Sequence, residues 1–237
     1  MSLISAATED VSNDRWTNPQ RTSAEGSGEV PKSLGVRTRP LQVTWEMTNV
    51  VGWKATPARA RTPRNLHQFS TAEAFHLIEE IAAMKVPLLA LTGGDPLLRP
   101  DLLPVIEFAS TRSVRTSLTM LPTPRLDPGV IAELKSCGLM RVAFWLHGST
   151  PGLNDAHWGI PGLHRRTLEI IGTCHEEQLP VQINTILSRR NYHDVDPMIE
   201  LLMRLDVTLW NVFFFVPASR EEAGNMLDAE AHEQIFA

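Results

Sequence analysis

The chain has 237 residues, of which 43% are hydrophobic, so it is long enough to bury the core of one sizeable domain. Its net charge of −5 gives no overall electrostatic reason to bind nucleic acid or an anionic membrane, and no apolar stretch approaches the ~20 residues that span a bilayer. Two cysteines, Cys137 and Cys174, exclude a disulfide framework, and the absence of a secretory signal favours a cytoplasmic protein.

The N-terminal stretch 1–35 is polar and has no apolar periodicity, which predicts a disordered tail. The remaining chain, 36–237, is expected to form one domain. From residue 41 onward, short β-branched runs alternate with amphipathic stretches. Strands are predicted near 41–47, 87–92, 114–119, 141–146, 181–187 and 207–215. Helices are predicted near 71–84, 101–111, 128–137, 163–178 and 195–205.

Local patterns support several of these boundaries. Ser70 and Glu73 fit a capping box at a helix start, and Gly138 stands where a helix needs a left-handed residue to end. A last helix is predicted from Asp228 to Ala237 without a cap, so we expect the domain to be truncated there. Six strands alternating with helices predict an α/β fold, a (βα)6 partial TIM-type barrel with parallel strands and outer helices.

Four segments at the ends of predicted strands carry a family resemblance. Residues 46–60 read E-M-T-N-V-V-G-W-K-A-T-P-A-R-A and open a connection longer than the usual span of about 2–6 residues. The second strand is followed by T-G-G-D-P, the fourth ends in F-W-L-H-G, and the fifth reads V-Q-I-N-T. In this order the segments resemble radical S-adenosylmethionine (SAM) enzymes, in particular the branch with a cysteine-rich, SPASM-like C-terminal region.

The resemblance implies an enzyme that binds SAM at a [4Fe–4S] cluster and generates a 5′-deoxyadenosyl radical. In that family a C-x3-C-x2-C motif holds the cluster. Here the three cysteine positions fall on Val51, Ala55 and Ala58. Because these side chains have no donor atom for iron, we expect no cluster to assemble and assign no metal-binding residue.

The resemblance also implies cofactor-binding residues. The turn of Gly93, Gly94, Asp95 and Pro96 is expected to hold the methionyl amino group of SAM through backbone oxygens and the acidic side chain. Two glycines also let the backbone approach a ligand closely. Asn184 is expected near the carboxylate and ribose of SAM, and an interior amide that fills the barrel is its alternative role.

Two residues at the end of the fourth strand depart from the family pattern. Trp145 stands at the position of a serine and His147 at the position of an aspartate. The indole could narrow a cofactor pocket. His147 titrates near neutrality and could act as a general acid or base, or it could be structural.

Three functions therefore remain open. The favoured one is a catalytically inactive radical SAM homologue, or a ligand-knockout or fragment of an active enzyme, with no catalytic residue and weak SAM binding. The second is an active enzyme with cluster ligands from elsewhere. The third is a non-radical barrel enzyme that uses His147, Asp95 or Asp155 in acid–base chemistry. The resemblance implies peptide modification or cofactor maturation, hence a peptide or small-molecule substrate, and we expect no nucleic-acid or membrane partner.

Overall fold

The computed structural model describes residues 40–50 and 68–236. The predicted tail 1–35 and the positions Val51, Ala55 and Ala58 lie outside the described residues. Among the described residues, six strands form one parallel sheet in the order β1-β2-β3-β4-β5-β6. Each strand thus pairs with the next strand in the sequence, as in a (βα)6 partial barrel, and the predicted fold class is confirmed.

The elements follow one another in strict alternation over most of the chain. The strands are β1 (Val43–Thr48), β2 (Leu88–Gly93), β3 (Arg115–Met120), β4 (Leu139–Trp145), β5 (Val181–Leu187) and β6 (Leu209–Phe214). The helices are α2 (Thr71–Ala83), α3 (Leu102–Thr111), α4 (Pro128–Ser136), α5 (Pro151–Trp158), α6 (Leu163–Glu176), α7 (Val195–Arg204) and α8 (Ala229–Phe236). Short 3-10 turns are η1 (Pro96–Leu98), η2 (Tyr192–Asp194) and η3 (Arg220–Asn225).

Helix ends lie where the local sequence predicts them. The Ser70 hydroxyl accepts a hydrogen bond from the Glu73 N–H at 3.3 Å, and the Glu73 carboxylate accepts one from the Ser70 N–H at 2.8 Å, which confirms the capping box of α2. Gly138 follows α4 with φ +92°, a conformation that glycine adopts without strain. The predicted helices and strands between residues 41 and 215 end within two residues of the observed ones.

The sequence analysis did not anticipate α5. This helix begins with Pro151, at a position where the missing N–H costs nothing, and ends at Gly159 with φ +65°. Its eight residues bury only two side chains, Asn154 and Trp158. A helix with so few buried positions shows no apolar periodicity in its sequence, which is why it was missed.

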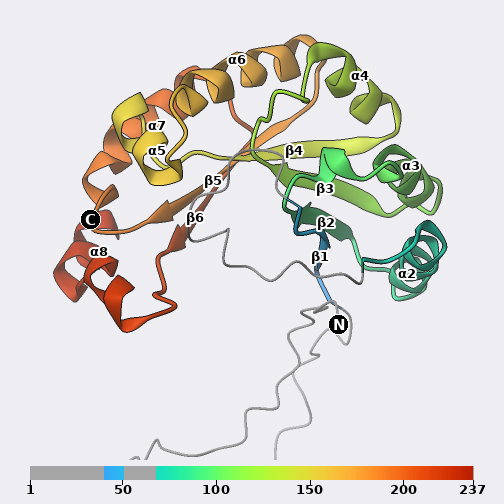
Figure 1. The fold of residues 1–237 in the computed structure, drawn as a ribbon, viewed down its shortest axis with the longest axis horizontal. Coiled ribbons are helices and arrows are strands. Elements are labelled where there is room, and N and C mark those ends of the chain that lie inside the picture. The colour runs from blue at the N-terminus through green and yellow to red at the C-terminus, as the bar shows by residue number, and fades with distance from the viewer. Residues whose placement is uncertain (1–39, 51–67, 237) are drawn as a thin grey trace, which may run out of the picture.

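The two faces of the sheet have different environments. Apolar side chains of one face pack with the buried sides of α2, α3, α4, α6 and α7 in a single core, and Figure 1 shows these helices gathered along that side of the sheet. Because side chains alternate along a strand, the remaining positions point to the other side, here called the inner face. The inner face comprises Thr44, Glu46, Leu88, Ala90, Thr92, Arg115, Ser117, Thr119, Arg141, Ala143, Trp145, Gln182, Asn184, Ile186, Leu209, Asn211 and Phe213.

None of the helices formed by the described residues has the length and apolar character needed to cross a membrane.

The cysteines belong to the helical layer. Cys174 is buried in the core on α6, and Cys137 is half-buried at the C-terminal end of α4.

Candidate functional site

The C-terminal ends of β1 and β2 are joined by backbone hydrogen bonds beyond the strands themselves. The Gly94 N–H donates to the Thr48 carbonyl at 2.6 Å, and the Asp95 N–H donates to the Val50 carbonyl at 2.7 Å. The chain that leads into residues 51–67 therefore starts alongside the predicted Gly93–Pro96 turn. In parallel α/β folds, this end of the sheet is where binding residues gather.

The two glycines of the turn are required by this close approach. A Cβ at Gly93 would lie 2.2 Å from the Thr48 carbonyl oxygen, and a Cβ at Gly94 would lie 2.0 Å from the Val50 carbonyl oxygen. Both distances are far below van der Waals contact, and Gly93 also has φ +123°. The sequence analysis related these glycines to a ligand. In the structure, the neighbour that excludes a side chain is the protein's own backbone.

Asp95 has a buried carboxylate oxygen that accepts no well-formed hydrogen bond from the described residues. Its side chain is 1% exposed, and its Oδ1 accepts a hydrogen bond from the Leu97 N–H at 3.2 Å, which begins η1. Its Oδ2 has no hydrogen-bond partner in the part of the chain that the structure describes. Burial raises the pKa of Asp95, and the Leu97 N–H, the Thr123 hydroxyl and the nearby Arg125 guanidinium offset part of this rise. A buried acceptor of this kind calls for a donor, such as an ammonium group.

A buried arginine joins the two chain segments that flank residues 51–67. The Arg99 guanidinium donates to the Met47 carbonyl and to the Phe69 carbonyl, each at 3.0 Å. The same group forms a bidentate pair with Asp101, at 2.9 and 2.7 Å, and lies 5.4 Å from the ring centre of Trp45. A second link joins these segments, because the Gln68 amide donates to the Thr48 hydroxyl at 2.8 Å.

A pocket of about 510 Å³ opens beside this arginine, here called the mouth pocket. Its lining comes from both flanking segments and from the stretch after η1, namely Thr48, Val50, Gln68, Phe69, Ser70, Thr71, Leu98, Arg99, Pro100 and Asp101. The mouth pocket is thus built by the same residues that hold the ends of the first long connection together. It places polar groups next to the Gly93–Pro96 turn.

Asn184 occupies a different part of the same face. It is buried on the inner face of β5, opposite Trp145 of β4 and Asn211 of β6, and its Oδ1 accepts a hydrogen bond from Gln182 at 2.7 Å. With strands about 4.8 Å apart, β2 and β5 are separated by about 14 Å along the sheet. The structure therefore does not bring Asn184 into contact with the Gly93–Pro96 turn. A ligand would have to extend across β3 and β4 to touch both.

His147 is held by three elements. Its Nδ1 accepts a hydrogen bond from the Ile186 N–H at 3.0 Å, so the neutral ring carries its proton on Nε2. Its backbone N–H donates to the Asn154 side chain at 3.0 Å, and its carbonyl accepts from the Asn191 amide at 2.9 Å. The ring also lies 3.9 Å, centre to centre, from the His157 ring. These contacts tie the end of β4 to β5, α5 and the turn before η2, and they favour the structural role of His147.

Asp155 has a structural role, because its carboxylate binds backbone N–H groups at the start of α6. Its carboxylate oxygens accept hydrogen bonds from the Gly162 N–H at 2.6 Å and from the His164 N–H at 2.7 Å. It therefore satisfies free backbone donors at the start of α6. With its two oxygens so occupied, Asp155 does not support the acid–base hypothesis.

Trp145 packs toward the C-terminal end of the barrel, as its position predicts. Its ring contacts a small apolar cluster of Leu121, Trp158, Ile160 and Leu163 and lies 5.8 Å from the Phe213 ring centre. The indole thus fills space between β4 and β6 on the inner face.

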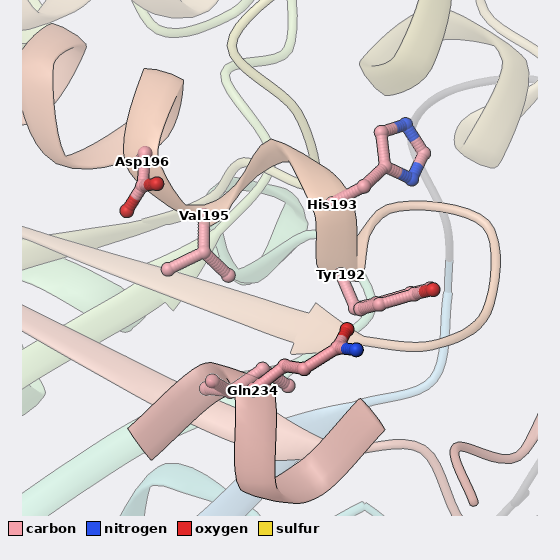
Figure 2. Close-up of a pocket in the computed structure, with 6 residues that line it drawn as sticks. Tyr192, His193, Val195, Asp196 and Gln234 are labelled. Carbon is pink, nitrogen blue, oxygen red and sulfur yellow. The ribbon is translucent and has the colours of Figure 1, made fainter. Parts of the chain in front are cut away.

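A further pocket of about 370 Å³ lies between η2, α7 and α8. Figure 2 shows Tyr192 and Gln234 extending toward the same region, whereas His193 and Asp196 point elsewhere. Its polar groups do not converge on one point. Over residues 40–50 and 68–236, moreover, no group of three or more His, Cys, Asp and Glu side chains is arranged to hold a metal ion.

Comparison with known proteins decides the family. The sequence profile of the Radical SAM superfamily matches residues 51–202, well over half of the chain. The chain belongs to the radical SAM superfamily. Among its relatives, an AdoMet-dependent heme synthase from Methanosarcina barkeri is 28% identical over 205 residues, which cover 86% of this chain and 58% of that protein. A PqqA peptide cyclase from Rhodopseudomonas palustris is 28% identical over 186 residues, which cover 77% and 48%.

Solved structures agree on the radical SAM fold. SuiB from Streptococcus suis, bound to S-adenosylmethionine, superposes with a TM-score of 0.69 at 11% identity, over 84% of this chain and 47% of SuiB. At that identity the likeness concerns the fold alone. The chain spans 58%, 54% and 51% of the length of the three heme synthases that it matches.

The residues of this radical SAM protein fit the two family cofactors unequally. At the positions that the resemblance gives to the cluster cysteines, Val51, Ala55 and Ala58 offer no sulfur, nitrogen or oxygen in their side chains, and side chains of this kind do not bind iron. The unpaired oxygen of Asp95, in contrast, fits the positively charged amino group of SAM.

Proposed function

We propose that this radical SAM superfamily protein does not bind a [4Fe–4S] cluster and is catalytically inactive in radical chemistry. It is then an inactive homologue, or a ligand-knockout or fragment of an active enzyme. The proposal is supported by the side-chain chemistry of Val51, Ala55 and Ala58, which the resemblance places at the three positions of the family's cysteine motif. Iron–sulfur clusters are held by cysteine thiolates, with histidine as an occasional replacement, and neither is present at these positions.

The two cysteines of the chain are poor replacements. Cys137 lies two residues before β4, and the Cys174 carbonyl accepts a hydrogen bond from the Leu179 N–H, two residues before β5. Both thiols therefore lie near the N-terminal ends of strands, opposite the end that carries the Gly93–Pro96 turn. Burial raises the pKa of Cys174 to about 12, so this group stays a thiol near neutral pH. These facts weigh against an active enzyme that takes its cluster ligands from elsewhere in the described residues.

SAM is the cofactor that the remaining site would bind, and we expect weak binding. Asp95 would accept a hydrogen bond from the methionyl ammonium through its unpaired Oδ2, within the Gly93–Pro96 turn. Asn184, on the inner face of β5, would contact the distant part of an extended ligand. When bound together with a cluster, SAM supplies a radical in this family. Without the cluster, the residues present can position the cofactor but cannot activate it.

The substrate class follows from the relatives and is likewise a proposal. Relatives of this chain are named as heme synthases, PqqA peptide cyclases and a mycofactocin maturase, and SuiB has been solved bound to its precursor peptide SuiA. We therefore infer a peptide or a small molecule of cofactor maturation as the ligand or ancestral substrate. We also infer the branch with a SPASM-like C-terminal region and a cytoplasmic location.

Anaerobic reconstitution with iron and sulfide tests the proposal. The expected result is sub-stoichiometric iron and no visible absorbance of a cluster, because three thiolate bonds are missing. Treating the variant with cysteine at positions 51, 55 and 58 in parallel controls for the reconstitution itself. One cluster per chain in the unaltered protein would refute the proposal.

A further inference from the structure

Arg141 is a half-buried cation on the inner face of β4 that no acceptor satisfies. Its Nε atom is buried and has no hydrogen-bond partner, and its guanidinium forms no ion pair with any residue that the structure describes. The buried Arg99, by comparison, satisfies its guanidinium with a carboxylate and two carbonyls. A partly desolvated guanidinium without an acceptor is unfavourable, so its surroundings indicate what it binds.

The neighbours of Arg141 are cationic or neutral. Arg141 pairs in register with Ser117 of β3, and Arg115 lies two residues earlier on the same face of that strand. The Arg115 Nε donates to the Pro87 carbonyl at 3.2 Å, which holds this second cation at the N-terminal end of the sheet. Burial lowers the pKa of Arg141, and repulsion by Arg115 lowers it further. An anion close to Arg141 would offset both the desolvation of its guanidinium and the repulsion by Arg115.

No acid of the inner face is near enough to supply that anion. Among the inner-face positions of the described strands, Glu46 is the acidic one, and it lies on β1. Three strand spacings of about 4.8 Å separate β1 from β4, which gives about 14 Å along the sheet. Among the described residues, no ion pair joins Glu46 to Arg141.

Gln182 adds a second unfilled polar group beside Arg141. Its side chain is 6% exposed, and its Oε1 has no hydrogen-bond partner among the described residues, while its Nε2 donates to Asn184. Gln182 pairs in register with Ala143, two residues after Arg141 on the same face of β4. If both amides rotate, the Asn184 NH₂ group donates to Gln182 Oε1, and Gln182 presents its own NH₂ group to the inner face. Only with the NH₂ group presented can Gln182 donate to a carboxylate, because Oε1 and a carboxylate are both acceptors.

We propose that Arg141, with Gln182 beside it, binds a carboxylate group of a ligand that lies along the inner face. A planar guanidinium matches a carboxylate in two parallel hydrogen bonds, and this geometry distinguishes a carboxylate from a chloride ion. The carboxylate can belong to a small molecule or to an acidic side chain of a peptide. This inference rests on the proposed function for the ligand's place in the barrel, but it requires neither a cluster nor SAM.

Calorimetry of the purified chain tests the inference with two probes, citrate as a free carboxylate and a short peptide that contains two glutamates. Sodium chloride at equal ionic strength and the corresponding glutamine peptide serve as controls. We expect at least one carboxylate probe to bind, and the probe that binds identifies the source of the carboxylate. Arg141→Gln should weaken that binding about tenfold or more, and Arg141→Lys should weaken it less, because lysine keeps the charge but loses the paired hydrogen bonds. Arg165→Gln is the matched control, since the Arg165 side chain is 82% exposed on α6.

Thermal unfolding keeps the inference testable if a variant is unstable. The carboxylate probe that binds should raise the melting temperature of the unaltered protein and of Arg165→Gln, but not that of Arg141→Gln. In citrate-free buffer Arg141→Gln should melt no lower than the unaltered protein, because it removes an unsatisfied cation. Equal weakening in Arg141→Gln and Arg165→Gln, or no binding of any carboxylate probe, would overturn the inference. Iron uptake by the unaltered chain would refute the proposed function without affecting this result.

Discussion

Replacing Arg99 by alanine should destabilise the protein more than replacing any exposed arginine. Arg99 is 7% exposed and holds Asp101, which is nearly as buried, together with the Met47 and Phe69 carbonyls. Removing one partner of a buried ion pair typically costs about 3–5 kcal/mol, because the other charge is left unpaired. At about 2–4 °C per kcal/mol for a domain of this size, the melting temperature should fall by about 6–20 °C.

The control is Arg165→Ala. Arg165 lies 3.6 Å from Glu169 on the same helix, and the two side chains are 82% and 57% exposed. An exposed pair of this kind contributes about 0.3–0.5 kcal/mol. Arg99→Lys should fall between the two, because one ammonium group cannot reach acceptors that the guanidinium meets in several directions. Thermal and urea unfolding followed by circular dichroism measure all three variants.

The pH dependence of stability tests whether the Arg99–Asp101 ion pair causes the destabilisation. Burial alone would raise the pKa of Asp101, but hydrogen bonds from Arg99 and Thr71 overcome this effect and lower it. A carboxyl group with a lowered pKa stabilises the fold above its unfolded value of about 3.9 and loses this contribution as the pH falls through the folded value. The difference between the unaltered protein and Arg99→Ala should therefore shrink below about pH 4. Two results would refute this explanation. One is a fall in melting temperature for Arg99→Ala no larger than that for Arg165→Ala, and the other is a stability difference between the unaltered protein and Arg99→Ala that stays the same below about pH 4.

Two further predictions concern the cofactors. The triple variant Val51→Cys, Ala55→Cys, Ala58→Cys should take up part of the iron of a full cluster. Adding Pro57→Tyr should increase the uptake, because proline fixes φ near about −65°. If the quadruple variant takes up no iron, the loop differs from the family in more than its ligands. Calorimetry of the unaltered chain with SAM should give a dissociation constant in the millimolar range or weaker. Without the bond between SAM and the cluster iron, a micromolar site loses about 3–5 kcal/mol of binding free energy. A low-micromolar dissociation constant without iron would contradict this prediction.

Much of the fold could be predicted because local and tertiary signals agree. In α2 the capping box, the apolar spacing and the buried residues Ala74, Ile78 and Ile81 all specify the same helix. α5 escaped prediction because it buries Asn154 through a hydrogen bond to His147 rather than through apolar contact. Such a contact depends on a partner outside the helix, here the loop after β4, and periodicity along one helix does not reveal it.

The candidate site could be predicted in position but not in detail. The sequence placed the Gly93–Pro96 turn after the second strand, where the structure has it. It did not single out Arg99 or Arg141. Arg99 is important because residues on both sides of a long connection converge on it, and Arg141 because its neighbours on adjacent strands fail to satisfy it. Both properties arise from pairings between distant segments, which composition and spacing do not encode.

The two glycines and Asp95 differ in how strongly they argue that this turn binds SAM. Gly93 and Gly94 are required by the backbone of Thr48 and Val50, so they would persist in a protein that no longer binds any cofactor. Asp95 differs, because one oxygen is enough to begin η1, and the Thr123 hydroxyl and the Arg125 guanidinium offset only part of the cost of burying the other. An asparagine could accept the same hydrogen bond from Leu97 without a buried charge. The carboxylate of Asp95, rather than the glycines, is therefore the feature of this turn that argues for a bound cation such as the ammonium group of SAM.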